Sequence, residues 1–296
     1  MNHKIVCPVC KKDEAVKLFE KEGWIFVQCK EDQLVYINPQ PDKEELKKIY
    51  NTYGKEIFLN PELISICWDY PDYRKRFLDY RLTNRLLEIG VATGGFLEWC
   101  RKDGWDTYGV ELSAPSSLFA REQKGLNVVT GSLHEAGYPN EFFDIAVAWQ
   151  TIEHITNPRE IAEEVYRILR PGGFFVLSVP CWEGLSIRLL GKRYRYIGRD
   201  HLFYFSPRNM ERMLRGVGFS KVVTKTGGFN PISWYQDATA KIMRSQKNLA
   251  EKVQRMNSLV IRFRTTPFLK GVHRIYYKII EALNLGDTLF AEALKE

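Results

Sequence analysis

The 296-residue sequence lacks any run of about 18 apolar residues, so it predicts no transmembrane helix. Residues 1–7 contain no long apolar segment, and we therefore expect no secretory signal and a cytoplasmic protein. Internal repeats and low-complexity segments are also missing. With 45% hydrophobic and 27% charged residues, the composition excludes a disordered or collagen-like chain. What remains is a globular protein with one large domain and smaller additions.

Most of the sequence has equal numbers of basic and acidic residues. The chain has 43 Lys and Arg against 36 Asp and Glu, a net charge of +7. Residues 236–286 contain ten of those bases and three of those acids, so this segment (10 − 3 = +7) carries the whole excess. A uniformly basic nucleic-acid-binding protein would not have this distribution, and we expect no nucleic-acid partner.

Short apolar runs alternate with helical patterns after residue 83, which indicates a parallel sheet wrapped by helices. The expected strands are 85–89, 107–110, 127–130, 144–149, 174–179, 219–226 and 287–293, and the expected helices are 96–102, 116–123 and 158–169. We divide the chain into a cysteine-bearing segment (1–41), a helical linker (42–82), an α/β core (83–235), a basic helical insertion (236–286) and the last strand of the core (287–296).

A glycine-rich turn follows the first expected core strand, and a helix follows the turn. Glycine allows a tight turn and close approach of a ligand to the backbone, and the helix start offers free N–H groups. Glu111 ends the next strand, where a carboxylate can accept hydrogen bonds from ribose hydroxyls. The pattern predicts a site for a nucleoside-containing cofactor; the alternative is a tight turn beside an exposed glutamate.

The turn reads Glu88-x-Gly90-x-Ala92-x-Gly94, which resembles the E/D-x-G-x-G-x-G motif of class I S-adenosylmethionine-dependent methyltransferases. Ala92 replaces the middle glycine. Further stretches resemble that family in order: 130–134, 142–145, 149–155, 169–173 and 201–207. The resemblance implies a Rossmann-like fold, with a seven-stranded, mostly parallel sheet, helices on both faces and a helical insertion before the last strand.

The resemblance also implies S-adenosylmethionine as cofactor and S-adenosylhomocysteine as product. Ser132 stands where the family usually has an aspartate beside the adenine, which keeps an oxygen but loses a charge. The implied cofactor-binding residues are Glu88, Gly90, Ala92, Gly94, Phe96, Glu111, Leu112, Ser132, Leu133, Trp149 and Gln150.

Three residues are candidates for the chemistry of methyl transfer. His154 follows the strand end beside the expected methyl group and is the first choice for a general base. Glu153 is expected to orient this imidazole or to support the loop, and His201 to act as an alternative base or to position substrate. The alternative for Glu153 and His154 is a structural role in bracing the next helix.

Cys7, Cys10 and Cys29 have the spacing of a zinc ribbon, and a reducing compartment makes a Cys-x-x-Cys pair a metal or redox site before a disulfide. The segment resembles the N-terminal ribbon of many bacterial methyltransferases, but Asp32 occupies the place of the fourth cysteine. A zinc site with Cys7, Cys10, Cys29 and Asp32 is chemically sound, because carboxylates bind zinc. The alternative is a hairpin that has lost its metal.

The basic segment 236–286 predicts amphipathic helices. Lys270, Arg274 and Lys278 follow one another at helical spacing, opposite an apolar stripe. Three uses stay open: contact with an anionic membrane surface, packing on the core or on a second copy in a homodimer, and a lid over the substrate.

Taken together, these features predict a methyltransferase that acts on a hydroxyl of a small-molecule, saccharide or lipid-linked acceptor. An RNA methyltransferase is the second hypothesis, although the ribbon lacks the stacking aromatic residues and interleaved bases that would read RNA. A non-catalytic regulatory or scaffold protein that binds S-adenosylmethionine is the third. It is suggested by Ala92, Ser132 and Asp32, which depart from the family pattern.

Overall fold

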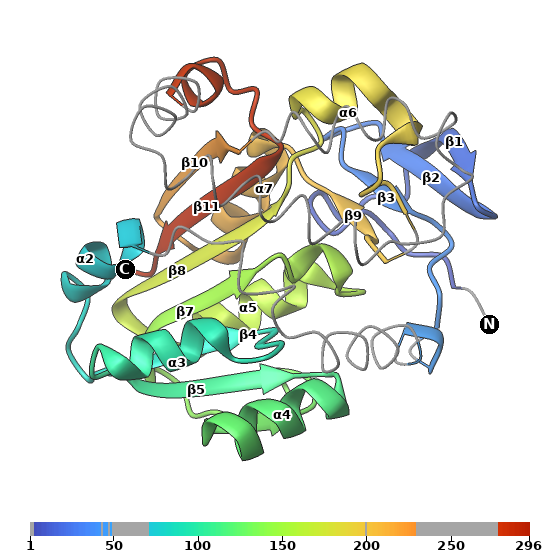
Figure 1. Ribbon diagram of the computed structural model, residues 1–296. Helices are drawn as coiled ribbons and strands as arrows, with labels where there is room; N and C mark the ends of the chain where they lie inside the picture. The colour runs from blue at the N-terminus through green and yellow to red at the C-terminus, as the bar shows by residue number, and fades with distance from the viewer. Residues whose placement is uncertain (1–2, 43, 47, 49–70, 199, 229–277) are drawn as a thin grey trace, which may run out of the picture.

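The fold was analysed in a computed structural model, which describes residues 3–42, 44–46, 48, 71–198, 200–228 and 278–296 (Figure 1). Its centre is a seven-stranded sheet. The strands are β4 (Arg85–Ile89), β5 (Asp106–Glu111), β6 (Val128–Thr130), β7 (Phe143–Trp149), β8 (Leu169–Pro180), β10 (Lys221–Gly227) and β11 (Thr288–Leu294).

The sheet has the order β10-β11-β8-β7-β4-β5-β6. The pairs β4–β5, β4–β7, β5–β6 and β7–β8 are parallel, whereas β11 lies antiparallel between β8 and β10. This arrangement confirms the predicted α/β fold with a mostly parallel, seven-stranded sheet. The structure adds that the last strand, β11, runs antiparallel to both of its neighbours.

Helices cover both faces of the sheet (Figure 1). On one face, α2 (Pro71–Leu78), α3 (Gly95–Lys102) and α4 (Ala114–Lys124) share a buried apolar cluster with alternate residues of the strands. On the other face, α5 (Pro158–Ile168) and α7 (Pro207–Val217) belong to a larger cluster. β7 is buried along its whole length because it is central and covered on both sides.

The helix ends follow from local sequence. Asn157 caps α5 with Pro158 in the first turn, and Ile161, Val165 and Ile168 recur on its buried face at helical spacing. Ser206 and Asn209 form a reciprocal capping box at the start of α7. Helix α7 is not among the helices expected from the sequence, although Ser206-Pro207 is a strong start signal.

A second, four-stranded sheet has the order β1-β2-β3-β9. Its strands are β1 (Ala15–Lys21), β2 (Trp24–Cys29), β3 (Val35–Ile37) and β9 (Phe203–Tyr204). Three come from the N-terminal segment and one from the core, so this sheet joins residues on both sides of the boundary expected at residue 41. Tyr36 of β3 stacks on Phe203 of β9, with ring centroids 6.1 Å apart.

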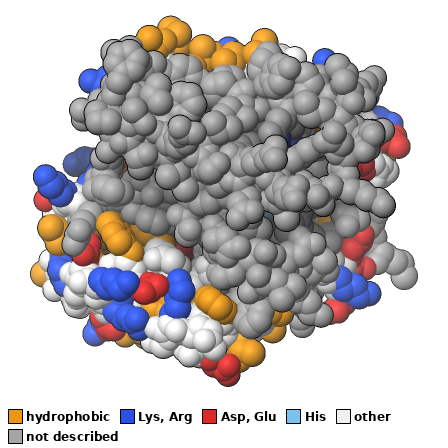
Figure 2. Space-filling view, in the orientation of Figure 1, with side chains coloured by type: hydrophobic (Ala, Val, Ile, Leu, Met, Phe, Trp, Pro, Cys, Tyr) orange, Lys and Arg blue, Asp and Glu red, His pale blue; other side chains and the backbone are white. Residues whose placement is uncertain are grey.

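The basic insertion 236–286 lies largely outside the described residues; of its three stepped bases only Lys278 is described, in a helical stretch over 278–282. In the described part of the chain, no helix is both long and apolar enough to cross a bilayer. Basic and acidic side chains are interspersed over α3 and α4 (Figure 2), where Glu98 pairs with Lys102 and Lys124. The described core is thus mixed in charge.

One buried carboxylate ties the start of the sheet together. Asp144 of β7 is fully buried, and its Oδ2 accepts hydrogen bonds from the backbone N–H groups of the loop before β4, residues 82, 83 and 84, at 2.7–3.0 Å. Its Oδ1 accepts from Arg170 of β8. Burial alone would raise the pKa of Asp144, but these hydrogen bonds outweigh it and lower the pKa below its usual value.

We expect Asp144→Asn to reduce the free energy of unfolding by about 3 kcal/mol. The substitution replaces the carboxylate with an uncharged amide and leaves Arg170 without its counter-ion. Denaturant titrations of both proteins at pH 7 measure this difference. Because the folded-state pKa is lowered, the stabilisation is present above the unfolded-state pKa and disappears as the pH falls. The two proteins should therefore converge in stability below about pH 4.

Asp106→Asn is the matched control, since Asp106 is an exposed aspartate at the start of β5. It should change the free energy of unfolding by less than about 0.5 kcal/mol. Equal losses in the two variants would contradict the role given to Asp144.

Candidate functional site

The predicted glycine turn lies at the carboxyl edge of the parallel strands, where β4 passes into α3. Gly90 has a φ of +77°, and its N–H donates to the Val110 carbonyl of β5 at 2.9 Å. A Cβ at this position would lie 2.3 Å from Oγ1 of Thr151, which follows β7. Glycine is therefore required here by the neighbouring strand end as well as by the turn.

Gly94 caps the N-terminus of α3 in the left-handed conformation, with a φ of +74°. A Cβ there would lie 2.4 Å from Cδ1 of Leu126. Ala92 also has a positive φ, +49°. Ala92, which replaces the middle glycine of the motif, thus has the positive φ that glycine adopts readily.

Glu111, at the end of β5, holds the turn in place. Its Oε2 accepts from the Ala92 N–H at 2.8 Å and its Oε1 from the Ser113 N–H at 2.7 Å. Burial raises the pKa of Glu111, while these amide hydrogen bonds lower it in part. Each carboxylate oxygen has a second lone pair, so the group can still accept from ribose hydroxyls.

Glu88 lies in β4 with only 4% of its surface exposed. Burial, and next the charge of Glu111, raise its pKa well above the usual value, while the Leu97 N–H at the start of α3 lowers it in part. These effects favour the neutral carboxyl group. A cationic group placed beside Glu88 would reverse this preference and favour the carboxylate.

Aromatic residues predicted to contact the cofactor form a buried group. Phe96 of α3 packs edge-on against Trp149 at the end of β7, with ring centroids 5.5 Å apart, and Tyr73 of α2 lies 5.4 Å from the same tryptophan. Leu133 is also buried, whereas Leu112 is 40% exposed. Phe96 and Trp149 are brought together, and Leu112 is left open to solvent beside Glu111.

The remaining predicted cofactor residues sit in local turns. Ser132 donates from both its N–H and its hydroxyl to Oε2 of Glu135, at 2.7 and 2.8 Å. Gln150 has a φ of +46°, and its N–H donates to the Ser178 carbonyl of β8 at 2.8 Å. Both positions end parallel strands at the same edge as Glu111.

His154 closes a short 3-10 helix, η2 (Ile152–His154), after β7. Its Nδ1 is hydrogen-bonded to the backbone carbonyl of Asp200, and its Nε2 lies 3.8 Å from Oε1 of Glu153. The ring meets that of His201 edge-on, with centroids 4.6 Å apart. The three predicted catalytic residues therefore form one group, in which a carbonyl, rather than Glu153, orients the imidazole of His154.

Two of the three side chains in this group are shielded from solvent. Glu153 is fully buried and His201 is 5% exposed. Burial raises the pKa of Glu153 well above its usual value and lowers that of His154; burial and next the proximity of His154 lower the pKa of His201 to about 3. Desolvation thus favours the neutral form of all three side chains.

Main-chain hydrogen bonds connect this group to the four-stranded sheet. The Leu202 N–H donates to the Glu153 carbonyl at 2.8 Å, and the Ile37 N–H donates to the Leu202 carbonyl at 2.9 Å. β9 follows directly and pairs with β3. The N-terminal segment therefore fixes the stretch that carries His201, a connection that sequence spacing does not reveal.

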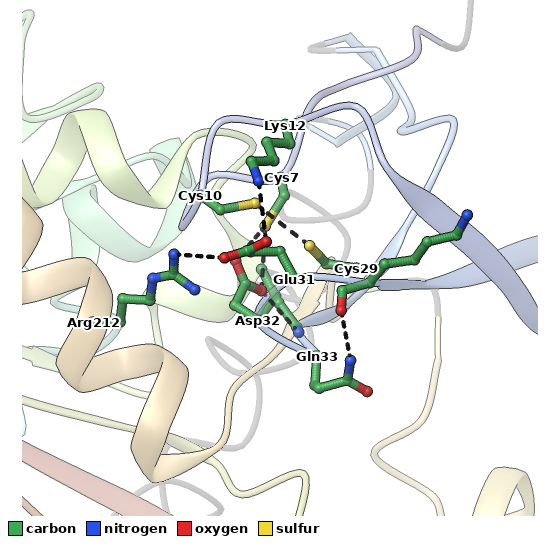
Figure 3. A network of polar contacts seen from close by, with 10 residues as sticks. Cys7, Cys10, Lys12, Cys29, Glu31, Asp32, Gln33 and Arg212 are labelled. Carbon is green, nitrogen blue, oxygen red and sulfur yellow. Dashed lines mark hydrogen bonds and ion pairs between the residues drawn. The ribbon is translucent and has the colours of Figure 1, made fainter.

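The cysteines of the N-terminal segment meet Asp32 in one cluster (Figure 3). The Cys7 sulfur lies 3.3 Å from Oδ2 of Asp32, the Cys10 and Cys29 sulfurs are 3.5 Å apart, and the four ligand atoms all lie within 4.8 Å of one another. A tetrahedral zinc ion with Zn–S bonds of about 2.3 Å separates its ligand atoms by about 3.5–3.8 Å. The four side chains therefore fit such an ion.

Two equivalent turns present these four ligands. After the first, the Lys11 N–H donates to the Cys7 carbonyl at 2.8 Å; after the second, the Gln33 N–H donates to the Cys29 carbonyl at 3.1 Å. Lys11 and Gln33 share a positive φ, +64° and +63°. Asp32 thus occupies the place in the second turn that Cys10 has in the first.

Neighbouring charges dock this cluster onto the core. Glu31 pairs with Lys12 at 3.1 Å and with Arg212 of α7 at 3.2 Å (Figure 3). Burial is the largest effect on the Cys7 and Cys10 thiols, raising the pKa of both, that of Cys10 to about 11. A bound cation would reverse this preference by favouring the thiolates.

Residues 64–224, more than half of the chain, match the sequence model of a family described as a methyltransferase domain. A ubiquinone biosynthesis O-methyltransferase of Ruegeria pomeroyi is 29% identical over 167 residues, which cover 51% of this chain and 65% of that protein. A Methanocaldococcus jannaschii protein described as uncharacterised is 28% identical over 143 residues, covering 47% and 65% of the two chains. The match thus spans less than two thirds of these relatives.

Solved structures share the fold at low identity. An S-adenosylmethionine-dependent methyltransferase from Thermotoga maritima aligns with a TM-score of 0.53 and 19% identity, covering 86% of this chain and 99% of that one. The [4+2]-cyclase SpnF aligns with the same TM-score and 16% identity, covering 86% and 97%. Because one neighbour is named a methyltransferase and another a cyclase, this likeness shows the fold alone.

We expect Gly94→Ala to lower the free energy of unfolding by about 2–4 kcal/mol, because alanine disfavours a positive φ and its methyl group would overlap Leu126. Chemical denaturation without added ligand measures the effect.

Gly95→Ala is the control at the adjacent position, where a Cβ would meet nothing within 4 Å and the φ is not positive. It should leave the protein as stable as before, or more stable by up to about 1 kcal/mol. A Gly94→Ala protein of undiminished stability would contradict the packing role of this glycine.

Proposed function

The chain belongs to the methyltransferase domain family, and on that basis we propose that it transfers the methyl group of S-adenosylmethionine to a hydroxyl of a small-molecule, saccharide or lipid-linked acceptor. The observation that carries this proposal is the arrangement of one sheet edge. The turn held by Glu111 and the group around His154 follow strands whose carboxyl ends lie at that same edge.

The cofactor side of the proposal uses the turn and Glu111. The free N–H groups at the start of α3, the carboxylate of Glu111 and the neighbouring Leu112 would receive the nucleoside. Glu88 is buried beside another carboxylate, which disfavours its charged form. The positively charged sulfonium and ammonium groups of the cofactor would provide a counter-ion for it. Phe96, Ser132, Leu133, Trp149 and Gln150 stay predictions as further contacts.

The chemical step is an in-line displacement. The acceptor oxygen attacks the methyl carbon, the carbon–sulfur bond breaks, and sulfur keeps the electron pair as S-adenosylhomocysteine is released. The hydroxyl proton passes to Nε2 of His154, because hydrogen bonding to the Asp200 carbonyl requires the proton of a neutral imidazole on Nδ1. Positioning of the two reactants supplies the larger part of the rate enhancement.

The choice of a hydroxyl acceptor is supported by the relatives named ubiquinone biosynthesis O-methyltransferases. Desolvation keeps the imidazoles of His154 and His201 neutral, so the ring lone pairs are not occupied by protons, but it also disfavours the imidazolium that proton transfer would form. Tyr196, which is half exposed, stacks parallel to His201 at 5.9 Å and offers an apolar surface beside the group.

We further propose that Cys7, Cys10, Cys29 and Asp32 bind zinc in a structural role. A zinc ion would balance the charge of two buried thiolates, the partly buried thiolate of Cys10 and a buried carboxylate, and would hold the two turns together. The ordered turns in turn place Glu31 against Arg212 and lead into β3. The ion would thus stabilise the N-terminal segment and would affect the methyltransferase core only through these contacts.

The purified protein should bind S-adenosylmethionine and transfer its labelled methyl group to a hydroxyl-bearing acceptor from a cell extract. His154→Asn should lower turnover roughly 10²–10⁴-fold, because it removes the group that receives the proton. Its cofactor dissociation constant, measured by calorimetry, should stay within about twofold of the wild-type value.

His3→Asn is the control, because His3 is exposed and lies in the N-terminal segment. It should change neither quantity. Absence of cofactor binding in the wild-type protein would end the enzyme proposal, and equal losses of binding and turnover in His154→Asn would indicate a structural role.

For the cysteine cluster, elemental analysis should find about one zinc per chain, and Asp32→Ala should weaken zinc binding by about tenfold or more in competition with a chromophoric chelator. Asp32→Cys should retain or tighten binding, since the two turns are equivalent and would then hold four thiolates. Asp13→Ala, at an exposed aspartate of the same segment, serves as control. Zinc-free wild-type protein would refute the site.

A further inference from the structure

Glu153, His154 and His201 place one carboxylate and two imidazoles within reach of a single point. Their ligand atoms lie within 4.8 Å of one another, on two segments more than 40 residues apart in the chain. We propose that these three side chains bind a divalent metal ion, at a site separate from the cysteine cluster.

The hydrogen bonds leave the three ligand atoms facing one another. A backbone carbonyl only accepts, so a neutral His154 carries its proton on Nδ1, toward Asp200, and has a lone pair on Nε2. That lone pair faces Oε1 of Glu153 at 3.8 Å. Two acceptors at this distance, beyond a hydrogen bond, leave room for an electropositive ion between them.

The other two groups contribute buried polar atoms that have no hydrogen-bond partner. Both carboxylate oxygens of Glu153 and Nδ1 of His201 make no hydrogen bond, although Glu153 is fully buried and His201 is 5% exposed. Leaving such groups unsatisfied destabilises the folded protein, and more strongly when the group is charged. A metal ion would satisfy all three atoms at once.

The donor set selects the class of ion. Two imidazoles and one carboxylate suit Mn²⁺, Fe²⁺, Co²⁺ or Zn²⁺ and leave coordination positions open. With bonds of about 2.0–2.2 Å, ligand atoms around such an ion are about 3–4.4 Å apart, so small side-chain rotations bring these three into place. The side chain of His154 is 25% exposed, which leaves this group accessible from one side.

The role of this ion rests on the proposed function, whereas its binding does not. An acceptor hydroxyl in an open coordination position would lose its proton to water more readily, because the cation stabilises the alkoxide. The alkoxide oxygen then forms the bond to the methyl carbon, and sulfur keeps the electrons of the broken bond. In that state His154 is a ligand and water, instead of its Nε2, takes the proton.

Binding of Mn²⁺ tests the site, because manganese favours oxygen and nitrogen over thiolate ligands and so discriminates against the cysteine cluster. The electron paramagnetic resonance signal of free Mn²⁺ should fall as protein is added, with about one ion bound per chain. Glu153→Gln and His201→Gln should each weaken binding by about tenfold or more. Elemental analysis of the same samples counts any resident ion, which should be lost in the same variants.

Glu292→Gln is the matched control: Glu292 is another buried glutamate, but it pairs with Arg76 and Lys225. It should bind Mn²⁺ as the wild-type protein does. Should the two test variants fail to fold, Co²⁺ absorption of the wild-type protein decides, since an oxygen and nitrogen site gives weak visible bands without the intense thiolate band of the cysteine cluster.

Absence of Mn²⁺ binding at millimolar concentration, in protein without a resident ion, would overturn the site, as would undiminished binding in both variants. A protein that transfers methyl groups but binds no Mn²⁺ refutes this inference alone. One that binds Mn²⁺ but not S-adenosylmethionine refutes the proposed function alone.

Discussion

Two backbone hydrogen bonds, from Ile37 to Leu202 and from Leu202 to Glu153, connect the parts of this protein that matter for its chemistry. The first ties the N-terminal sheet to the stretch after His201, and the second ties that stretch to the end of β7. Because both are main-chain bonds, they fix backbone position whatever the side chains do. The paired histidines therefore depend on a hairpin that lies far from them in sequence.

Burial of ionisable groups without a counter-ion is the second theme of the structure. Glu88, Glu153 and Cys7 are all nearly or fully buried, and burial raises the pKa of each. Asp144 shows the opposite solution, since Arg170 and three amides satisfy it and its pKa is lowered. Satisfied groups hold the fold, whereas unsatisfied ones mark where a positively charged ligand would be stabilised.

The sequence predicted those features that depend on local pattern. Alternating apolar runs located all seven strands of the main sheet, and the spacing around Gly90 and Gly94 located the turn that Glu111 holds. The resemblance to a zinc ribbon suggested Asp32 as a fourth ligand, and the structure places Asp32 beside the three cysteines because the two turns have the same backbone geometry.

The rest depends on contacts between distant segments, which no local pattern encodes. β9 has only two residues, which is too short for an alternating apolar pattern, so the sequence did not predict its pairing with β3. The sequence also suggested Glu153 as the residue that orients His154, but the Asp200 carbonyl occupies that position. Every residue has a backbone carbonyl, so the sequence contains no signal that distinguishes the carbonyl of Asp200 from the others.

The pairing of β3 with β9 also sets an order of events during synthesis. Val35 lies opposite Tyr204, 204 − 35 = 169 residues later, so β3 has no partner on that side until most of the core has been made. At about 5–20 residues per second, this interval lasts roughly 8–34 seconds. The two cysteine-bearing turns, by contrast, lie within the first 33 residues and can close around a metal long before. The proposed ion would therefore order these turns early, while the edge of β3 stays without its partner strand until β9 has been made.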